Sequence, residues 1–534
     1  MPKIPSSVIA QLIHSAHQDP QLPRVNPTEA CWQLPASPIA HIRSENLPTK
    51  TTYAIIGSGV TGCSVAKNLL EGLNLHADAD TDEETAKGEV RRMVTVLEAR
   101  TLTSGATGRN GGHLVSPLPE EFCEFEKYLG REATTKIARF ANRTLEAMFK
   151  LAEEGDEELR NAAEARRVLS VCAYYDRGVF EEVKRSMRRY EECLPEEKGD
   201  SEIFEGEEAA REKWNMKDAV GVITNRAGAF WPYRLVTGLF SRLLENYPGR
   251  FALETETPVT SVEHDPSSDV KYPYLVNTNR GTIRATKVIY CCNGYTSHLL
   301  AKLRGKIWPL RGTMSVQASG PNFPNEGSQK SWSTLGKPRY DAQTGHFSYG
   351  LYYITQNSHT GDIFIGGEKQ ILTELLTSDD TTISLISKDA LESVLPTIFD
   401  KGWPEGQKPE IKKVWSGIMG FTPDHMPWVG ALPSSITGVR PVGGEYIAAG
   451  FNGYGMPLCW GSGEAVAKMI LGKEKEVEEW LPENFVISEE RLRSVYSTTE
   501  AGIYNMLMAE PGLWTKVRMG VGSVVKNIAE KVFG

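Results

Sequence analysis

Three glycines spaced as Gly-x-Gly-x-x-Gly lie between a strand-like and a helix-like segment near the start of the chain. A β-branched, apolar run at 51–56 precedes Gly57, and small and apolar residues at helical spacing follow at 63–70. Gly57 permits a tight turn, Gly59 lets the backbone approach a pyrophosphate, and Gly62 lets the helix pack closely on the sheet. The positive end of the helix dipole then faces the phosphates. The pattern therefore predicts a dinucleotide-binding turn, and a glycine turn that serves only packing is the alternative.

A carboxylate and a second glycine-rich loop follow this turn. Glu98 ends the strand-like run at 93–98, where it can accept hydrogen bonds from a ribose diol. It follows Gly57 by 41 residues rather than by about 20, and the acidic stretch at 76–89, which we expect to be a surface insertion, accounts for the excess. The second loop runs from Thr103 to His113. Its small residues and backbone donors could lie along the rest of an extended cofactor.

From this second loop onward the sequence resembles a known superfamily. The motif Ser-Gly-Ala-Thr-Gly-Arg-Asn-Gly-Gly-His at 104–113 is similar to a loop of the FAD-dependent amine and amino-acid oxidases of the D-amino-acid oxidase, glycine oxidase and sarcosine oxidase type. It is most similar to the branch that includes gamma-glutamylputrescine oxidase. Further similar blocks occur at 293–297, 308–312, 361–368, 415–424 and 443–456. Because these blocks follow one another in order over about residues 50–472, they are far more specific together than singly.

The last of these blocks also favours a cofactor contact on physical grounds. A strand-like run at 446–449 precedes the glycine loop from Gly450 to Gly455, and an alanine-rich helix is expected from about 458 to 470. Backbone amides at the start of that helix could hydrogen-bond the pyrimidine end of an isoalloxazine and stabilise negative charge on a reduced flavin. A simple packing turn is the alternative.

The resemblance implies FAD as the cofactor, bound without a covalent link. The residues expected to hold it come from the three loops and from positions in the later blocks. They are Gly57, Ser58, Gly59, Val60, Thr61, Gly62, Glu98, Ala99, Arg100, Ser104, Gly105, Ala106, Thr107, Asn110, Gly111, Gly112, His113, Val259, Asn293, Gly294, Gly420, Asp424, Gly450, Phe451, Asn452, Gly453, Tyr454, Gly455 and Met456.

The reaction that the resemblance implies is the oxidation of a CH–NH bond by hydride transfer to the flavin. The product is an imine that water hydrolyses, and molecular oxygen reoxidises the flavin and becomes H2O2. The flavin supplies the chemistry and the protein supplies placement and electrostatics. The alternatives are a dehydrogenase of the same fold that passes electrons to a carrier, a biosynthetic oxidative-cyclisation enzyme, and a flavin-binding scaffold whose catalytic pocket has decayed.

Departures from the better-known relatives narrow the substrate. Where glycine oxidase-like sequences carry an arginine that clamps the substrate carboxylate, this chain has Met419. Where sarcosine oxidase-like sequences carry a flavin-linking cysteine and a carboxylate-binding lysine, it has Gly417 and Pro457. Recognition of a carboxylate away from water rests on charge-assisted hydrogen bonds. We therefore expect an amine or amino-acid-like substrate whose carboxylate, if present, is remote from the reacting carbon.

The candidate catalytic residues are His113, Tyr454 and Arg311. His113 could be a base near the flavin or a hydrogen-bonding member of its loop, and the resemblance places Tyr454 near the flavin. Arg311 could anchor a substrate anion or form a salt bridge that ties the sheet to the FAD domain. Aromatic walls suit an amine, whose cation can lie over their ring faces. The substrate-facing candidates, for which a core position is the alternative except at Tyr454, are Trp308, Tyr352, Phe421, Tyr454 and Met456.

The composition excludes several other classes of protein. The 534 residues are 40% hydrophobic and 24% charged, and 68 acidic against 59 basic residues give a net charge of −9. There is thus no basic field for nucleic acid. No run approaches the ~18–20 apolar residues of a membrane helix, and the N-terminus does not resemble a signal peptide. The eight cysteines show neither a metal-ligand spacing nor a disulfide pattern. We therefore expect a cytoplasmic protein without a metal.

The fold class we predict is α+β. A Rossmann-like FAD-binding domain (α/β) would be interleaved with a substrate domain of antiparallel sheet plus helices. The FAD-binding domain takes residues 51–118, 219–300 and 411–472, because its cofactor blocks lie far apart in the sequence. The substrate domain takes 119–218, which has helical periodicity, and 301–410, which has strand-like pieces.

The two ends of the chain are expected to lie outside these domains. Residues 1–50 are rich in proline and read as an irregular arm, and residues 473–534 read as a helical tail. Apolar residues at 517–532 fall on one helical stripe, with basic residues elsewhere. Such a helix can make a peripheral membrane contact, and docking on the protein or on a partner subunit is the alternative.

Overall fold

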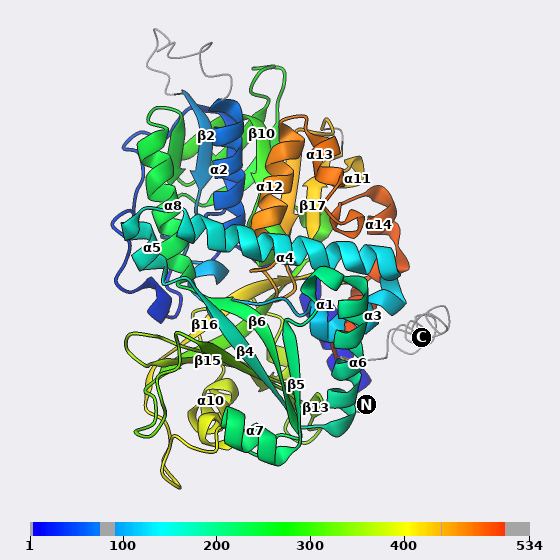
Figure 1. The fold of residues 1–534 in the computed structure, drawn as a ribbon. Helices are drawn as coiled ribbons and strands as arrows, with labels where there is room; N and C mark the ends of the chain where they lie inside the picture. Colours follow the sequence, from blue (N-terminus) through cyan, green and yellow to red (C-terminus); the bar gives the residue numbers. More distant parts are fainter. Residues whose placement is uncertain (1–3, 75–90, 439, 508–534) are drawn as a thin grey trace.

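The computed structural model describes residues 4–74, 91–438 and 440–507. The predicted insertion at 76–89 and the predicted amphipathic helix at 517–532 lie outside the described residues. The chain forms two sheets with helices packed on them, as Figure 1 shows. The predicted α+β class is confirmed. In the described part of the chain no helix is long and apolar enough to cross a membrane.

The first sheet carries two of the glycine loops at the carboxyl ends of its parallel strands. Its order is β17-β18-β10-β1-β2-β7, in which β18, β10, β1, β2 and β7 run parallel and β17 runs antiparallel to β18. A hairpin of β8 and β9 pairs with β10. The bounds are β1 (Lys50–Ile56), β2 (Arg91–Leu97), β7 (Phe251–Glu254), β8 (Val259–His264), β9 (Tyr274–Thr278), β10 (Gly281–Tyr290), β17 (Trp428–Ala431) and β18 (Glu445–Ala449). Ligands of such sheets bind outside the carboxyl ends of the strands.

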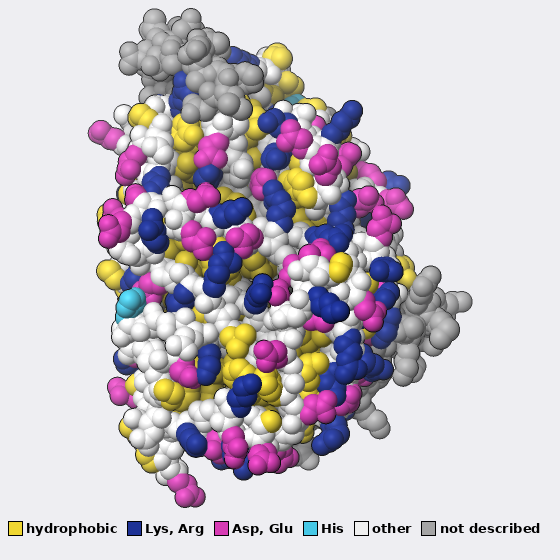
Figure 2. All heavy atoms as spheres, in the orientation of Figure 1, with side chains coloured by type: hydrophobic (Ala, Val, Ile, Leu, Met, Phe, Trp, Pro, Cys, Tyr) yellow, Lys and Arg dark blue, Asp and Glu magenta, His cyan; other side chains and the backbone are white. Residues whose placement is uncertain are grey.

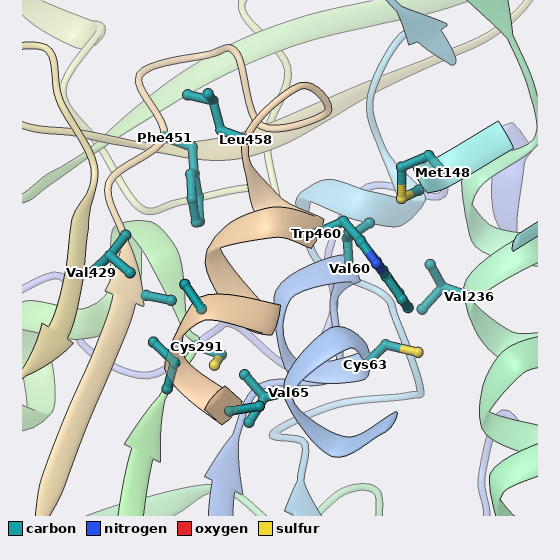
Figure 3. Packing of buried hydrophobic residues seen from close by; sticks show 14 of the residues in the cluster. Val60, Cys63, Val65, Met148, Val236, Cys291, Val429, Phe451, Leu458 and Trp460 are labelled. Atoms are coloured by element: carbon teal, nitrogen blue, oxygen red, sulfur yellow. The ribbon is translucent and has the colours of Figure 1, made fainter. Parts of the chain in front are cut away.

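Two helices that follow glycine loops pack against each other on one face of this sheet. They are α2 (Val60–Asn74) and α12 (Cys459–Ile470), with α8 (Pro232–Asn246) beside α2. Figure 3 shows Trp460 of α12 lying against Val60 of α2 and reaching toward Val236 of α8. Gly463 permits this contact, because a Cβ there would lie 2.7 Å from the Cβ of Ser64. The shared core therefore holds the starts of α2 and α12 side by side.

The second sheet has the order β16-β11-β15-β14-β12-β4-β6-β3, with β13 paired to β14 and β5 paired to β6. Only the β12–β4 pair of this sheet is parallel in the described structure. The bounds are β3 (His113–Leu114), β4 (Arg166–Tyr174), β5 (Ser201–Glu205), β6 (Gly221–Ala229), β11 (Trp308–Gln317), β12 (Lys330–Leu335), β13 (Arg339–Tyr340), β14 (His346–Gln356), β15 (Ile363–Ile371) and β16 (Ile411–Phe421). The predicted largely antiparallel sheet is thus present.

Helices cover both faces of the second sheet, and alternation along β4 distinguishes the faces. Val171 and Ala173 pack toward α7 (Glu207–Trp214) and α10 (Leu385–Ile398). Cys172 and Tyr174 pack toward α6 (Arg177–Cys193) on the opposite face. The long helix α4 (Arg131–Glu153) crosses between the two sheets in Figure 1, with α3 (Leu118–Leu129) beside it. Figure 2 shows acidic and basic side chains interspersed over most of the face drawn.

The structure differs from two of the predicted segment boundaries. The strand β6, within the segment 219–300, pairs with β4 of the second sheet, and β16, within 411–472, pairs with β11 of the same sheet. After β6 the chain therefore returns to the first sheet at Phe251, where β7 begins. After β16 it returns at Trp428, where β17 begins. Alternating strands look alike in sequence whichever sheet they join, because pairing partners lie far apart in the chain.

The predicted irregular arm contains a core element. Helix α1 (Ser6–Ala16) begins directly after Pro5, and Leu12 and Ala16 are fully buried against α15 (Thr499–Leu507) and β11. The prolines that suggested irregular structure flank this helix rather than interrupt it. The remaining helices of four or more residues in the described ranges are α5 (Glu157–Ala163), α9 (Thr296–Leu299), α11 (Ser434–Thr437), α13 (Glu474–Glu478) and α14 (Glu489–Arg493).

Candidate active site

The first glycine loop joins β1 to α2 and needs glycine at two of its positions. Gly57 has a φ of +111°, and a Cβ there would lie 2.6 Å from the carbonyl oxygen of Cys291. A Cβ at Gly62 would collide with the carbonyl oxygen of Gly57. At Gly59 the nearest atom to such a Cβ is Oγ1 of Thr107, 3.0 Å away. The loop is therefore a cradle that side chains would fill, as a phosphate-binding turn requires.

Hydrogen bonds join the first loop to Glu98 and to the second loop. The N–H and the hydroxyl of Ser58 donate to Oε2 of Glu98 at 3.2 and 2.7 Å. Thr103 donates from its N–H to Oγ of Ser58 and from its hydroxyl to the carbonyl of Ser58, each at 2.8 Å. The N–H of Val60 donates to Oγ1 of Thr107 at 3.1 Å. The two loops and the end of β2 are thus one connected unit.

The segment that leads into β8 lies beside the same unit. The N–H of Thr257 donates to the carbonyl of Glu98 at 2.8 Å, and the N–H of Glu98 donates to the carbonyl of Glu254 at 2.9 Å. Val259, which follows, is buried. A glycine cradle, the N-terminus of α2 and a carboxylate at the end of β2 fit the phosphate and ribose groups of a dinucleotide.

Two arginines near these loops are bound by protein groups. Arg100, predicted to contact the cofactor, is buried and donates from Nη1 to Oδ2 of Asp380 at 2.8 Å. Arg109 is also buried and donates to the carbonyls of Ser104 and Ser416, both at 2.8 Å. Burial and the neighbouring Arg100 lower the pKa of Arg109 to about 10. Arg109 therefore fastens the second loop to β16 of the second sheet, and Arg100 binds the segment between β15 and α10. The contact of Arg100 with the cofactor stays a prediction.

The third loop is held at the carboxyl ends of β10 and β18. Oδ1 of Asn293 accepts from the N–H of Gly450 at 2.9 Å, and the N–H of Asn452 donates to the carbonyl of Gly420 at 2.8 Å. A Cβ at Gly294 would lie 2.5 Å from the carbonyl oxygen of Met419. Five predicted cofactor positions, from three distant parts of the sequence, thus meet around one loop. They are Asn293, Gly294, Gly420, Gly450 and Asn452.

The second and third loops also touch each other. Nδ2 of Asn110 donates to the sulfur of Met456 at 3.6 Å. Oδ1 of Asn110 accepts from the N–H of Gly112 at 2.9 Å, which shapes the turn at the end of the second loop. The three loops that the sequence singles out therefore surround one continuous region along the carboxyl edge of the first sheet.

Asp424 has a partner within the protein. Its two carboxylate oxygens accept from Nε and Nη2 of Arg491 at 2.8 and 3.0 Å, and the guanidinium carbon of Arg491 lies 3.8 Å from the centroid of the Trp428 ring. Both side chains of the pair are mostly buried. Asp424 therefore fastens α14 to the loop that precedes β17, and its predicted contact with the cofactor stays a prediction.

Two predicted substrate-side residues of β11 make contacts with other parts of the protein. Arg311 is buried, donates from Nη1 to Oγ1 of Thr382 at 2.9 Å and lies 4.0 Å from Glu374. Its guanidinium thus packs on the segment after β15, and burial lowers its pKa. Trp308 is 1% exposed and packs among residues of α1 and α15, including Leu12. Both side chains thus have protein partners, and their roles toward the substrate stay predictions.

Alternation along β14 distinguishes two adjacent tyrosines, of which Tyr352 is a predicted substrate residue. Tyr352 packs on the face that carries α7 and α10, where its ring would meet a Cβ at Gly367. Tyr353 points to the other face, where its ring would lie 2.9 Å from a Cβ at Gly111. It also meets the imidazole of His113, with ring centroids 6.2 Å apart. Tyr353, rather than Tyr352, is the tyrosine that borders the second loop.

His113 pairs through its backbone with Ala229 at the edge of β6. Burial lowers the pKa of its imidazole to about 4, so the ring is uncharged at neutral pH. An uncharged imidazole can accept a proton or a hydrogen bond. The two alternatives for His113, a base near the flavin and a hydrogen-bonding member of its loop, therefore both stay predictions.

A pair of carboxyl groups that the sequence analysis did not single out borders the third loop. Glu120 and Glu121 lie in the first turn of α3, and the hydroxyl of Tyr454 lies 3.5 Å from Oε1 of Glu121. Burial and the neighbouring Glu120 raise the pKa of Glu121 to about 8. A Cβ at Gly453 would lie 3.7 Å from the ring of Phe421 and 3.8 Å from the sulfur of Met419. One wall of the site thus combines a carboxyl group, a phenol and apolar side chains. The only sequence feature that indicates this carboxyl pair is that α3 follows closely after the second loop.

Comparisons with known proteins agree with this geometry. The family model described as DAO, FAD dependent oxidoreductase, matches residues 52–469. The chain is 24% identical to the probable oxidoreductase OrdL of Rhizobium meliloti (strain 1021), over 84% of this chain and 92% of that protein. It is 22% identical to the gamma-glutamylputrescine oxidoreductase of Escherichia coli (strain K12), over 90% of this chain and 98% of that protein.

Solved structures share the fold. The glycine oxidase from Geobacillus kaustophilus superposes with a TM-score of 0.57 at 17% identity, over 83% of this chain and 100% of that one. The L-proline dehydrogenase from P. horikoshii superposes with a TM-score of 0.56 at 20% identity, over 82% of this chain and 97% of that one.

Proposed function

This chain belongs to the DAO family of FAD-dependent oxidoreductases, and on that basis we propose that it oxidises the CH–NH bond of an amine or amino-acid derivative to an imine. Two curated or solved relatives are named for substrates of this kind, gamma-glutamylputrescine and glycine. When bound, FAD supplies the acceptor for the two electrons, and we propose that molecular oxygen takes them on to give H2O2. The carrying observation is that three glycine loops meet beside a wall that holds Glu121 and Tyr454.

The residues proposed to hold FAD follow from the loop geometry. The turn from Gly57 to Gly62 and the N-terminus of α2 would receive the pyrophosphate, and Glu98 would receive the ribose diol. The third loop, anchored by Asn293, would border the flavin ring. We propose that the flavin is not covalently bound, since Gly417 offers no thiol at the position where related enzymes link it.

The substrate side would be formed by Tyr454, Phe421 and Met419 on one wall and by Tyr353 and His113 on the other. With Arg311 turned toward Thr382, this arrangement favours an amine over a substrate held by a carboxylate beside the reacting carbon.

Anaerobic reduction of the purified, FAD-loaded chain tests the proposal. The panel is 1,4-diaminobutane, gamma-glutamylputrescine, N-methyl amino acids, glycine and proline, and loss of the flavin absorbance band is the readout. We expect at least one amine to bleach the band and to yield H2O2 under air. Bleaching without H2O2 would assign a dehydrogenase that uses another acceptor. If no member of the panel bleaches the band, the proposed amine oxidation is wrong for these substrate classes.

A further inference from the structure

Helix α3 presents Glu121 to the third loop in a fixed orientation. The adjacent Phe122 is fully buried and packs edge-to-face on Tyr190, with ring centroids 5.7 Å apart. Arg189 of α6 binds Glu126 of the same helix through two hydrogen bonds, at 2.6 and 2.8 Å. These contacts fix the rotation of α3 about its axis. The carboxyl group of Glu121 is therefore held facing Tyr454.

The described residues that shift the pKa of this carboxyl group are acidic or phenolic, and none of them is a cation. They are Glu120 and Glu124 on its own helix and Tyr454 on the third loop. Glu120 in turn faces the hydroxyl of Tyr174 and the thiol of Cys172, both on β4. A partly buried carboxylate with acidic neighbours is unfavourable, and a cation brought in by a ligand would relieve this.

Three arginines in or next to the loops and strands of the site bind other groups of the protein. Arg109 and Arg100 bind Asp380 and backbone carbonyls, and Arg311 binds Thr382. Met419 and Phe421 lie beside Gly453, the residue that precedes Tyr454 in the third loop. A substrate carboxylate placed here would meet a carboxyl group and apolar atoms, whereas an ammonium group would meet a carboxyl group and an aromatic ring.

We propose that Glu121, with the ring of Tyr454, binds the ammonium group of the substrate and thereby selects a cationic amine over a carboxylate-bearing amino acid. This inference rests on the proposed function, because it names the substrate charge that the same site accepts. Glu121 in this role is a specificity-determining residue that touches substrate.

Binding has a proton balance that can be measured. With a pKa of about 8, most Glu121 side chains carry a proton at pH 7. An arriving ammonium ion pairs with the carboxylate, so the carboxyl proton is released to solvent while the ammonium keeps its own. Affinity for an ammonium ion should therefore rise by about fivefold from pH 7 to pH 8 and by about a further twofold above pH 8 before it levels off.

The test uses the FAD-loaded full chain, with 1-aminobutane and 1,4-diaminobutane as cationic probes and butanoate as the anionic one. Dissociation constants come from perturbation of the flavin spectrum and from calorimetry in buffers of different ionisation enthalpy, and neither readout needs turnover. Glu121→Gln should weaken both cationic probes by about 10- to 100-fold and abolish the rise with pH. Glu121→Asp should restore part of the loss. Glu208→Gln, an exposed position in the first turn of α7, is the matched control and should change nothing.

A second variant keeps the test decisive if Glu121→Gln fails to retain FAD. Glu120→Gln removes the neighbouring charge, so it should move the midpoint of the pH dependence below 8 while ammonium binding persists. Unchanged affinities and unchanged pH dependence in both variants would overturn the inference. Ammonium binding that depends on Glu121 in a protein that no amine reduces would support the inference and refute the proposed function.

Discussion

Replacing Gly62 by alanine tests whether the first glycine loop shapes the cofactor site. A Cβ at this position would collide with the carbonyl oxygen of Gly57, and backbone cannot yield as a flexible side chain can. The turn would have to open, which displaces the amides at the start of α2 that are proposed to face the pyrophosphate. Gly105 in the second loop, also a predicted cofactor position, is the sterically open comparison, because nothing lies within 4 Å of a Cβ there and its φ is −76°.

The expected size of the effect follows from the cost of overpacking. Forcing one methyl group into a closely packed site costs about 1–3 kcal/mol. If the turn relaxes in the free protein and must be restored when FAD binds, this cost appears as about 5- to 150-fold weaker FAD binding. Gly59→Ala should lie between the two variants, since its nearest neighbour is a hydroxyl group at 3.0 Å.

Flavin content after purification and titration of the apoprotein with FAD, followed by flavin fluorescence, give the dissociation constants. Circular dichroism shows whether each variant is folded. We expect the order Gly105→Ala, Gly59→Ala, Gly62→Ala for increasing loss of FAD. A folded Gly62→Ala variant that binds FAD as tightly as Gly105→Ala would refute the assignment of this loop to the cofactor.

Three further predictions address the flavin linkage, a histidine and a pair of tyrosines. Acid precipitation should leave FAD in the supernatant, because Gly417 carries no thiol, and flavin in the pellet would contradict this. Because the folded pKa of His113 is lowered to about 4, the unfolded chain binds the proton first as pH falls below about 6.5. The loss in Tm between pH 6.5 and 4.5 should therefore be smaller in His113→Asn than in the wild type, and equal losses would argue against a buried neutral ring. Tyr353→Ala should shift the flavin absorbance spectrum and Tyr352→Ala should not, so the reverse result would place the wrong face of β14 toward the site.

The parts of the site that were predictable from the sequence are local. The first and third glycine loops each join a strand to a helix within about a dozen residues, at β1–α2 and at β18–α12. Periodicity gives the elements, and the need for a tight turn gives the glycines. The carboxyl ends of parallel strands meet at one edge of a sheet, so loops that are nearly 400 residues apart could be expected at one site.

The face of a strand was less predictable. Between Ser348 and Tyr352 the strand β14 takes four steps while β15 takes two, and regular alternation of the faces cannot be assumed across such a bulge. Adjacent aromatic residues such as Tyr352 and Tyr353 offer no pattern that would show which one points to the loops.

Charged residues inside the cofactor blocks were assigned by their position in the motif, and their partners lie far along the chain. Asp424 pairs with Arg491, 67 residues away, and Arg100 pairs with Asp380, 280 residues away. Nothing in either block shows that its charge is already neutralised. Buried ion pairs of this kind hold the segments around the site together, and removal of one partner leaves an uncompensated charge.

Glu121 was missed for a related reason. Acidic residues at 120, 121, 124 and 126 are typical of the solvated face of a helix. The buried Leu118 and Phe122, of which Phe122 packs against Tyr190, turn the first turn of α3 inward. The same wall carries Met419 at the position where glycine oxidase-like sequences have a carboxylate-binding arginine. A wall that lacks this arginine and carries a carboxyl group should prefer a cation to an anion, rather than only bind an anion more weakly. The ratio of butanoate to 1-aminobutane affinity therefore tests this explanation more sharply than either affinity does alone.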